Sequence, residues 1–312
     1  MKNPVIKIVA VNISDKKGVG KKPVDHIDLI ETGIIGDAHA GLWHRQVSLL
    51  GLESIERFEK QAGRKIQPGE FAENITTSGI ELVQCKPLDK FVSDNLELEV
   101  TQIGKECHGH TCSIFREVGN CVMPKEGIFT RVIKAGSLQP GDKLNYVRKQ
   151  FRVKLITLSD RASRGEYEDL SGKRISELLH NFFTNENRSF EIDYKLMPDS
   201  AEQLRIEIIK ASEQQFDYIF TCGGTGIGPK DITVDVVKSC IDKDIPGIMD
   251  MIRLKYGADK PNALISRSVA GIISNSIIFT LPGSQKAVQE YMTEIVKTMM
   301  HIKYMLHSID AH

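Results

Sequence analysis

The feature that most restricts the fold is an apolar run, DYIFTC, that leads directly into a glycine-rich turn, CGGTGIGPKDIT, at residues 222–233. Glycines after a strand let the backbone turn sharply and present its N–H groups to a ligand. The turn is not a P-loop, because that pattern places a lysine after its second glycine, whereas Pro229 follows Gly228. The dinucleotide fingerprint is also excluded, because Gly224, Gly226 and Gly228 are spaced by two throughout. The segment is therefore a glycine turn of another kind.

Strands and helices alternate along the second half of the sequence. The capping box formed by Ser200 and Gln203 begins one helix, Thr233 is expected to cap another, and 284–308 is expected to be one long closing helix. A further helical face lies in GKRISELLHNFF. The order predicts a mostly parallel sheet with helices on both faces, a three-layer α/β domain. Strands are expected at 152–159, 190–197 and 217–222 and in SNSIIFTLPGS.

The first half has a different sequence pattern, in which short apolar runs such as VIKIVAV, QVSLLG and LELEVTQIG are separated by turn residues. Regular turns between short runs indicate a β-rich domain, with one helix expected at 51–62. The sequence pattern changes at the charged stretch NYVRKQ. We therefore predict a first domain at 1–147, a linker at 148–151 and a second domain at 152–312.

Composition and charge exclude several classes of protein. The formal net charge is zero, with 41 basic and 41 acidic residues, so the excess of positive charge typical of nucleic-acid binders is absent. The N-terminus, MKNPVIKIVAVNIS, is too broken by lysine for a secretory signal, and no apolar run approaches the length of a membrane span. A cytoplasmic protein with reduced cysteines is expected, with no nucleic-acid or membrane partner.

Two aspartates follow strands of the second half. Asp231 lies at the end of the glycine turn, where a carboxylate facing phosphates needs a bridging cation, so it suggests a Mg²⁺ ligand. Asp199 follows the strand at 190–197 and could reach the same edge of the sheet, where ligands bind in open α/β folds. Alternatively, Asp231 only caps a helix and Asp199 is a solvated turn residue.

An ordered set of motifs in the second half resembles the molybdopterin adenylyltransferase domain of the MogA/MoaB type, over residues 151–312. Any single motif is weak, but the ordered set is specific. The motifs are TLSDRASRGEYEDLSG (157–172), MPDS (197–200), TCGGTGIGPKDIT (221–233), IPGIMDMIR (245–253), ALISRSVAG (263–271) and LPGS (281–284).

This resemblance implies roles for individual residues. Asp199 and Asp231 fall on the two acidic catalytic positions and would hold Mg²⁺, and Asp160 and Arg161 fall on an SDR signature of structural role. Val234 stands where the family often has proline, a departure that affects no catalytic group. The nucleotide-binding turn matches Gly223, Gly224, Thr225 and Gly226, and the molybdopterin-side loops match Ser266, Arg267, Pro282, Gly283 and Ser284.

The resemblance also implies a reaction, in which a phosphate of molybdopterin attacks the α-phosphorus of ATP and releases pyrophosphate. The implied substrates are ATP and molybdopterin, the implied metal is Mg²⁺, and pyridoxal phosphate is not expected. A homo-oligomer is implied, as a trimer through the second domain. Such transfer needs positioning and charge neutralisation rather than a covalent nucleophile, so Cys222 is interpreted as a small core residue.

A cluster of thiols and imidazoles lies in KECHGHTCSIFREVGNCVMP of the first half. A structural zinc site is one interpretation, although the usual spacing of zinc ligands is absent. A single reactive thiolate is another, and ordinary buried cysteines are a third. The cluster comprises Cys107, His108, His110, Cys112 and Cys121.

The segments GIIGDAHAG, RQVSLL, PGEFAENITTSGIEL, LEVTQIGKECHGHTCSIF and MPKEGIFTRVIKAGSLQPGD resemble the MOSC domain, over about residues 4–147. The resemblance implies a β-rich barrel that handles sulfur or the molybdenum cofactor through one cysteine. Cys112 is the best match, with Cys107 and Cys121 as rivals. His39, His44, Arg45 and Arg131 are candidates to face the phosphate of a pterin.

Three functional hypotheses follow. The first is an enzyme of molybdenum cofactor biosynthesis, with an adenylyltransferase joined to a MOSC domain. The second is a carrier that binds molybdopterin or the cofactor without catalysis. The third is a structural protein stabilised by a metal in the first half.

Overall fold

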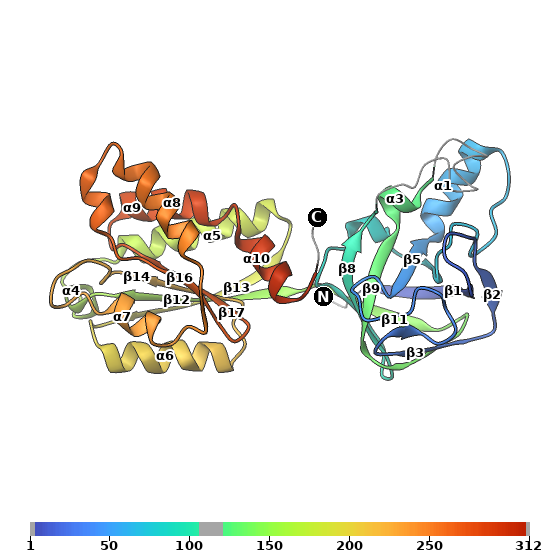
Figure 1. Cartoon of the computed structure of the whole chain (residues 1–312), viewed down its shortest axis with the longest axis horizontal. Helices are drawn as coiled ribbons and strands as arrows, with labels where there is room; N and C mark the ends of the chain where they lie inside the picture. Colours follow the sequence, from blue (N-terminus) through green and yellow to red (C-terminus); the bar gives the residue numbers. More distant parts are fainter. Residues whose placement is uncertain (1–3, 106–120, 310–312) are drawn as a thin grey trace. The chain divides into compact units, whose positions relative to one another are not determined.

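The computed structural model describes residues 4–105 and 121–309, which form two compact units (Figure 1). The first unit runs to Lys149 and includes the last residues from Ser308, and the second runs from Gln150 to His307. The last strand of the first unit and the first strand of the second are separated only by residues 148 and 149. In the part of the chain that the structure describes, no helix is both long and apolar enough to cross a membrane.

Seven strands of the first unit close into a barrel, because the last strand in the order of pairing, β1, also pairs with the first, β11. This confirms the β-rich barrel expected for the first half. All pairs are antiparallel except β5 with β6. In the order of pairing the strands are β11 (Lys143–Val147), β7 (Lys90–Val92), β8 (Glu97–Ile103), β9 (Ile128–Lys134), β5 (Val47–Gly51), β6 (Ile75–Ser78) and β1 (Val5–Ile13).

Shorter elements complete the first unit. One strand extends the barrel sheet beside β1, and three others form a small separate sheet. Helix α1 ends where the sequence predicted and begins one residue later, and it packs Phe58 edge-on against Phe71, with ring centroids 5.0 Å apart. The additional elements are β2 (Lys22–Val24), β3 (Ile27–Ile30), β4 (Gly33–Ile34), β10 (Gly136–Leu138), α1 (Leu52–Ala62), η1 (Leu82–Gln84) and α3 (Met123–Glu126).

The core of the first unit follows from the period of two along its strands. In β1, Ile6 and Ile8 are buried, and Lys7 between them is exposed. Successive side chains of a strand point to opposite faces, so one face of each strand fills the barrel interior. Ile6 and Ile8 meet Leu49 and Val100 in one apolar cluster.

A six-stranded sheet forms the centre of the second unit. Its first four strands are parallel, which confirms the predicted parallel arrangement for them, whereas β16 pairs antiparallel with both of its neighbours, β17 and β15. Every residue of β14 and β17 is buried, as expected for central strands covered on both faces. In order, the strands are β13 (Ser189–Met197), β12 (Gln150–Leu158), β14 (Tyr218–Cys222), β17 (Ser276–Leu281), β16 (Ala270–Ile273) and β15 (Lys243–Asp244).

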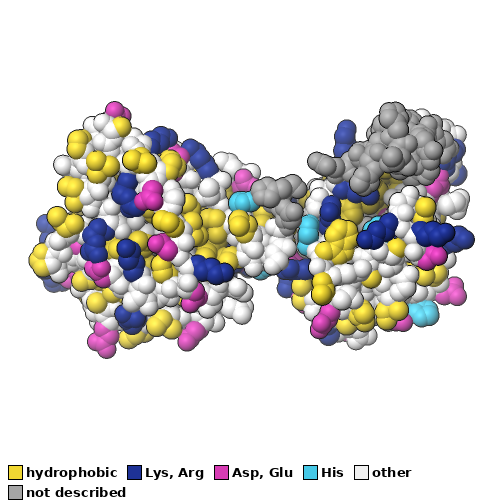
Figure 2. All heavy atoms as spheres, in the orientation of Figure 1, with side chains coloured by type: hydrophobic (Ala, Val, Ile, Leu, Met, Phe, Trp, Pro, Cys, Tyr) yellow, Lys and Arg dark blue, Asp and Glu magenta, His cyan; other side chains and the backbone are white. Residues whose placement is uncertain are grey.

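Helices cover both faces of this sheet, with α5 and α9 on one side and α6 and α7 on the other (Figure 1). Across the side of this unit visible in Figure 2, basic and acidic side chains are interspersed. The helices are α4 (Asp160–Ser163), α5 (Leu170–Asn185), α6 (Ala201–Glu213), α7 (Thr233–Lys238), α8 (Pro246–Gly257), η3 (Pro261–Ile265), α9 (Gln285–Ile295) and α10 (Met299–Leu306).

The prediction of one closing helix at 284–308 is wrong, because two helices occupy this segment. The amide of Thr298 donates to the carbonyl of Ile295, and its hydroxyl donates to the same oxygen at 3.1 Å. This tight turn replaces the usual bond to the fourth preceding residue. The capping prediction for the helix after Met197 is confirmed, since Ser200 accepts a bond from the amide of Gln203.

Candidate active site

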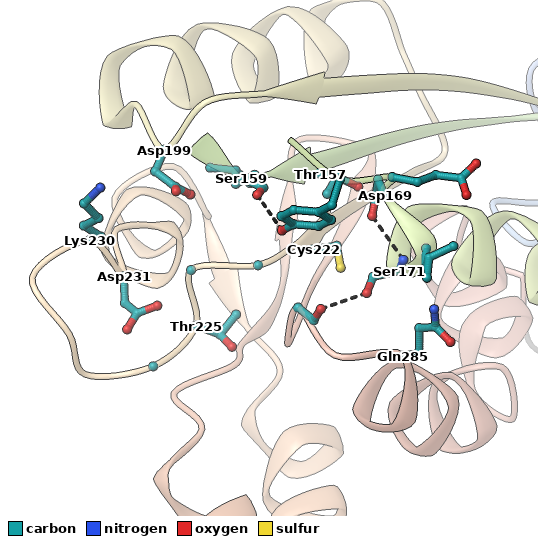
Figure 3. Close-up of a pocket in the computed structure, with 18 residues that line it drawn as sticks. Thr157, Ser159, Asp169, Ser171, Asp199, Cys222, Thr225, Lys230, Asp231 and Gln285 are labelled. Atoms are coloured by element: carbon teal, nitrogen blue, oxygen red, sulfur yellow. Dashed lines mark hydrogen bonds between the residues drawn. The ribbon is translucent and has the colours of Figure 1, made fainter. Parts of the chain in front are cut away.

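A pocket of about 540 Å³ lies where parallel strands of the second unit end (Figure 3). Its walls come from the ends of β12 and β14 and from residues that follow β13 and β17. The carboxyl ends of parallel strands are where open α/β sheets bind ligands. Residues that line the pocket include Thr157, Ser159, Tyr167, Asp169, Ser171, Asp199, Cys222, Gly223, Gly224, Thr225, Gly226, Lys230, Asp231, Gly283 and Gln285.

The first two glycines of the turn have backbone conformations that other residues rarely adopt. Gly223 has φ of +100° and Gly224 has φ of +63°. A Cβ on Gly223 would lie 2.5 Å from the carbonyl oxygen of Leu158, and one on Gly224 would lie 2.5 Å from Oγ1 of Thr233. Glycine is therefore required at both positions by conformation and by space.

Thr233 does not cap the helix after the turn, contrary to the prediction. It is the first residue of α7, and the preceding Ile232 makes no side-chain capping bond. The hydroxyl of Thr233 instead donates to the carbonyl of Gly223 at 2.8 Å. Sequence spacing pointed to a local capping bond, but the side chain bonds to a residue ten positions earlier.

Three successive amides of the turn differ from the amide before them in their hydrogen bonding. The amide of Gly223 donates to the carbonyl of Leu281 at 2.9 Å and continues the sheet. Among the residues that the structure describes, the amides of Gly224, Thr225 and Gly226 have no acceptor. Consecutive N–H groups in a glycine turn are suited to binding the oxygens of an anion.

The two aspartates expected to act together line this one pocket. Figure 3 shows Asp199, Lys230 and Asp231 gathered at one end and Asp169, Ser171 and Gln285 at the other. The Oδ2 atom of Asp231 accepts from the amide of Gly228 at 2.8 Å, which keeps its carboxylate beside the turn.

Asp199 is held by a second aspartate. Its Oδ2 accepts from the amide of Asp160, and its own amide donates to Oδ1 of Asp160, both at 3.1 Å. The other oxygen of Asp160 pairs with Nζ of Lys230 at 2.8 Å. The ammonium of Lys230 and the amide of Asp199 lower the pKa of Asp160, and the pairing raises the pKa of Lys230. The guanidinium of Arg161 lies over the Tyr167 ring, 4.9 Å from its centroid.

The donor set at this end of the pocket fits Mg²⁺, which prefers carboxylate, phosphate and water oxygens. Asp199 and Asp231 supply the carboxylates, and a nucleotide would supply phosphate oxygens. Among the described residues no group of three or more His, Cys, Asp or Glu is arranged to hold a metal by protein atoms alone. Two protein carboxylates match the usual way in which proteins hold Mg²⁺ beside substrate phosphates.

Comparison with known proteins identifies the second unit. The sequence model of a family described as a probable molybdopterin binding domain matches residues 154–301. A molybdopterin adenylyltransferase from Helicobacter pylori strain J99 is 36% identical over 144 residues, 46% of this chain and 80% of that protein. Molybdenum cofactor biosynthesis protein B from Bacillus cereus is 31% identical over 163 residues, 51% of this chain and 92% of that protein. The chain belongs to the MogA/MoaB family of molybdenum cofactor biosynthesis proteins.

Two further matches complete the comparison. The sequence model of the MOSC domain matches residues 36–145, within the first unit. A solved structure of MoaB from Thermus thermophilus is 32% identical and covers 50% of this chain and 96% of that one, with a TM-score of 0.46.

The residues matched to molybdopterin-side loops of the MogA/MoaB family divide into two groups. Gly283 lines the pocket, and its neighbours Pro282 and Ser284 accept bonds from Cys222 and from the amide of Ala287. Ser266 and Arg267 are not among the lining residues.

Ser266 and Arg267 have partners beside the glycine turn instead. Arg267 pairs with Asp235, and its amide donates to the carbonyl of Thr225 at 3.0 Å. The hydroxyl of Ser266 accepts from that of Tyr291 at 2.9 Å. Arg267 therefore supports the turn through its backbone.

Asp169 is a pocket residue that the sequence analysis missed. It caps α5 by accepting from the amides of Ser171 and Gly172, and its Oδ2 accepts from the hydroxyl of Tyr194 at 2.7 Å. Burial and this bond raise the pKa of Tyr194 above its usual value. The signal was available, because an aspartate directly before an amphipathic helix is a strong N-cap.

Cys222 is a core residue, as the sequence analysis proposed. It is fully buried, and its thiol donates to the carbonyl of Pro282. Burial, with the nearby charge of Asp169, raises the pKa of Cys222 to about 12. A thiol with that pKa is almost entirely protonated at neutral pH and is a poor nucleophile.

A second pocket, of about 680 Å³, lies in the MOSC domain. Its described lining carries the cations Lys17, Arg45 and Lys105 and no carboxylate. The guanidinium of Arg45 and the ammonium of Lys17 lie over the ring of Trp43, at 5.0 and 5.7 Å from its centroid. The remaining described lining residues are Gly18, His39, Ser48, Ala72, Asn74, Gln102, Met123 and Phe129.

Two of the four residues expected to face an anion in the MOSC domain line this pocket, namely His39 and Arg45. Arg131 instead pairs with Glu99 at 2.6 Å, and His44 is not among the lining residues.

A buried ion pair between Lys21 and Asp37 contacts His39. Nζ of Lys21 is 2.5 Å from Oδ2 of Asp37 and 3.2 Å from Nδ1 of His39. Burial by itself favours the neutral form of Asp37, but bonds from His39 and Lys21 outweigh it and hold the pKa of Asp37 below its usual value. Burial lowers the pKa of Lys21 despite the same pairing. This network fixes the position of His39 at the pocket wall.

The candidate thiols Cys107 and Cys112 lie outside the described residues. Their rival Cys121 is half-buried and packs against the apolar cluster around Phe58 and Phe129.

Proposed function

We propose that the second unit is a molybdopterin adenylyltransferase, which joins the adenylyl group of ATP to a phosphate of molybdopterin. One observation carries the proposal. Asp199 and Asp231, which follow different strands, line a single pocket beside three backbone amides that have no acceptor among the described residues. The identity to a molybdopterin adenylyltransferase over this unit supports the same activity.

The chemistry follows from these groups. A phosphate oxygen of molybdopterin forms a bond to the α-phosphorus of ATP, and the bond to the leaving pyrophosphate breaks. The amides of Gly224, Thr225 and Gly226 bind phosphate oxygens of the nucleotide. Asp199 and Asp231 would hold Mg²⁺, which neutralises the charge that develops on the phosphates. No covalent intermediate on the enzyme is required.

The test is incubation of the full chain with molybdopterin, Mg²⁺ and ATP, followed by mass analysis of the pterin and assay of pyrophosphate. Asp231→Ala should abolish adenylylation, because one of the two carboxylates proposed to hold Mg²⁺ is lost, and with it the metal that would neutralise the phosphate charge. Asp259→Ala, which removes an exposed aspartate outside the pocket, is the matched control and should retain activity. Full activity of Asp231→Ala would contradict the proposed site.

A non-catalytic carrier is the alternative for the second unit. A carrier binds molybdopterin and ATP but releases no pyrophosphate when both are present. Binding without turnover by the wild-type chain would favour this alternative. A trimer formed through the second unit belongs to the same proposal, and analytical ultracentrifugation of the full chain tests it.

For the first unit we propose that the MOSC domain handles the molybdenum cofactor or its sulfur, with Cys112 as the functional thiol and Cys107 and Cys121 as rivals. The pocket lined by Lys17, Arg45 and Lys105 favours an anionic ligand, because its described lining carries only positive charge. Arg45→Gln should weaken binding of the cofactor to the full chain, and Cys112→Ser should leave adenylylation unchanged. Zinc analysis of the full chain tests the alternative of a structural metal in the cysteine and histidine cluster.

A further inference from the structure

Three adjacent strands of the second unit each end near an aspartate. Asp199 follows β13, Asp160 follows β12, and the turn that carries Asp231 follows β14. Because β12 lies between β13 and β14 in the sheet, Asp160 lies between the two aspartates proposed to hold Mg²⁺. The proposed reaction assigns no role to this third carboxylate.

Both oxygens of Asp160 are used to contact the neighbouring segments. Oδ1 accepts from the amide of Asp199, while the amide of Asp160 donates to Oδ2 of Asp199, both at 3.1 Å. The pair is reciprocal, so it fixes the backbone and the carboxylate of Asp199 at the same time. Oδ2 of Asp160 pairs with Lys230, the residue before Asp231, at 2.8 Å.

A local capping role does not account for these contacts. Asp160 is the first residue of the short helix α4, but the cap of that helix is Ser159, whose hydroxyl accepts from the amide of Ala162 at 3.2 Å. The carboxylate of Asp160 is directed instead to residues 39 and 70 positions away in the sequence. Contacts of this range relate separate parts of the pocket to one another.

We propose that Asp160 is a positioning residue, which sets the spacing of Asp199 and Asp231 through the amide of Asp199 and the ammonium of Lys230. This inference rests on the proposed adenylyltransferase function. Two carboxylates that share a small ion must be held within a few tenths of an ångström, because Mg²⁺ demands near-ideal octahedral geometry. Lys230 lines the pocket, and its ion pair with Asp160 joins the glycine turn to the segment that follows β12.

Three substitutions separate the contacts of Asp160. Asp160→Asn retains an oxygen that can accept from the amide of Asp199 but removes the charge that pairs with Lys230. Asp160→Ala removes both contacts. Lys230→Gln removes the ion pair from the other side and leaves the contact between the two aspartates intact.

The first measurement is hydrogen exchange of the full chain without substrates, and it does not depend on activity. Asp160→Ala should accelerate exchange at the amide of Asp199 by about tenfold or more, since that amide loses its charged acceptor. Asp160→Asn and Lys230→Gln should change this exchange rate little. Unchanged protection at Asp199 in Asp160→Ala would overturn the proposal.

The second measurement is the Mg²⁺ concentration that gives half-maximal adenylylation. Asp160→Ala should raise it by about tenfold or more. Asp160→Asn and Lys230→Gln should each raise it by about two- to fivefold, as for loss of a partly exposed ion pair. The double variant Asp160→Asn with Lys230→Gln should require about the same Mg²⁺ concentration as either single variant, because the two residues share one interaction. The control is Lys195→Gln, which should behave like the wild type. It removes an ion pair outside the pocket, in which Nζ of Lys195 lies 2.7 Å from a carboxylate oxygen of Glu207.

Other outcomes of the second measurement contradict the proposal. A uniform loss of rate at every Mg²⁺ concentration would indicate a general structural role for Asp160. A loss in Lys230→Gln far larger than in Asp160→Asn would mean that Lys230 acts on the substrate directly. If the wild type does not adenylylate at all, the proposed function fails, while the exchange experiment still decides whether Asp160 positions Asp199.

Discussion

The hydroxyl of Thr233 donates to the carbonyl oxygen of Gly223 at 2.8 Å. This bond joins the first residue of α7 to the first residue after β14 and so closes the glycine turn on itself. Thr233 is fully buried, and its amide donates to the carbonyl of Gly224 at 3.1 Å. One residue therefore ties the start of α7 to the start of the segment that presents the amides of Gly224, Thr225 and Gly226.

Thr233→Val should weaken the turn while preserving the shape of the side chain. The change leaves the carbonyl of Gly223 without its hydroxyl partner in a buried place, which costs about 1–3 kcal/mol of stability. Thermal unfolding followed by circular dichroism measures the loss, and nucleotide affinity should fall with it. Thr293→Val is the control, because the hydroxyl of Thr293 is exposed and bonds only within α9. Equal behaviour of the two variants would contradict the role given to Thr233.

Gly224→Ala should lower stability and nucleotide affinity more than most substitutions of glycine by alanine. The new Cβ would lie 2.5 Å from Oγ1 of Thr233, and φ of +63° is strained for alanine. We expect a loss of about 1–3 kcal/mol and weaker nucleotide binding. Gly247→Ala, where a Cβ meets no atom within 4 Å, should leave both unchanged. Calorimetric titration of Mg²⁺ and ATP into each variant provides the comparison.

Cys222 should be chemically inert in the folded protein. Burial raises its pKa to about 12, so very little thiolate exists at pH 8. Alkylation by iodoacetamide, followed by peptide mass analysis, should modify the half-buried Cys240 well before Cys222. Cys222→Ala should keep its adenylylation activity. Rapid labelling of Cys222 in the native protein would show that the thiol is accessible and reactive.

Glu73 in the barrel should make the stability of the first unit depend on pH. Its side chain is fully buried, and burial raises its pKa despite bonds from the amide of Gly69 and the hydroxyl of Thr76. Above the unfolded pKa of glutamate, about 4.3, folding must take up a proton or bury a charge. Stability should therefore fall as the pH rises above that value.

Glu73→Gln should reduce this fall between about pH 5 and pH 8. Trp43, the single tryptophan of the chain, lies in the first unit, so its fluorescence during urea unfolding reports on that unit. Glu56→Gln, at an exposed position on α1, should retain the wild-type dependence. The same pH dependence in Glu73→Gln and the wild type would rule out the role given to Glu73.

Local patterns predicted much of the fold. The position of α1 and the cap at Ser200 depend on neighbouring residues, and the sequence predicted the helix to within one residue and the cap correctly. The continuous burial of β14 was likewise visible in its apolar run. Failures occurred where a distant contact replaced the local one, as at Thr233, or where a polar side chain inside a helical pattern bonded to its own backbone, as at Thr298.

The candidate site was predictable only in part, for the same reason. The glycine turn and Asp199 stand out because each follows a predicted strand, and Asp231 stands out because it lies at the end of that turn. The contact of Asp160 with Lys230 spans 70 positions, and no spacing rule relates such residues. Asp169 was overlooked although its place before α5 is a local signal. Its position in the pocket wall depends on the fold of the whole unit, which no local signal gives.

The outermost strand β13 limits how this domain can aggregate or assemble. It is nine residues long and forms one margin of the sheet, where an unpaired backbone invites addition of a strand from another molecule. Its charged residues Glu191, Asp193 and Lys195 are each engaged by an oppositely charged side chain. A foreign strand laid along β13 would have to disturb this row of charges. Fibril-like extension of the sheet is thus disfavoured at this margin, and copies of the protein are expected to meet through other surfaces.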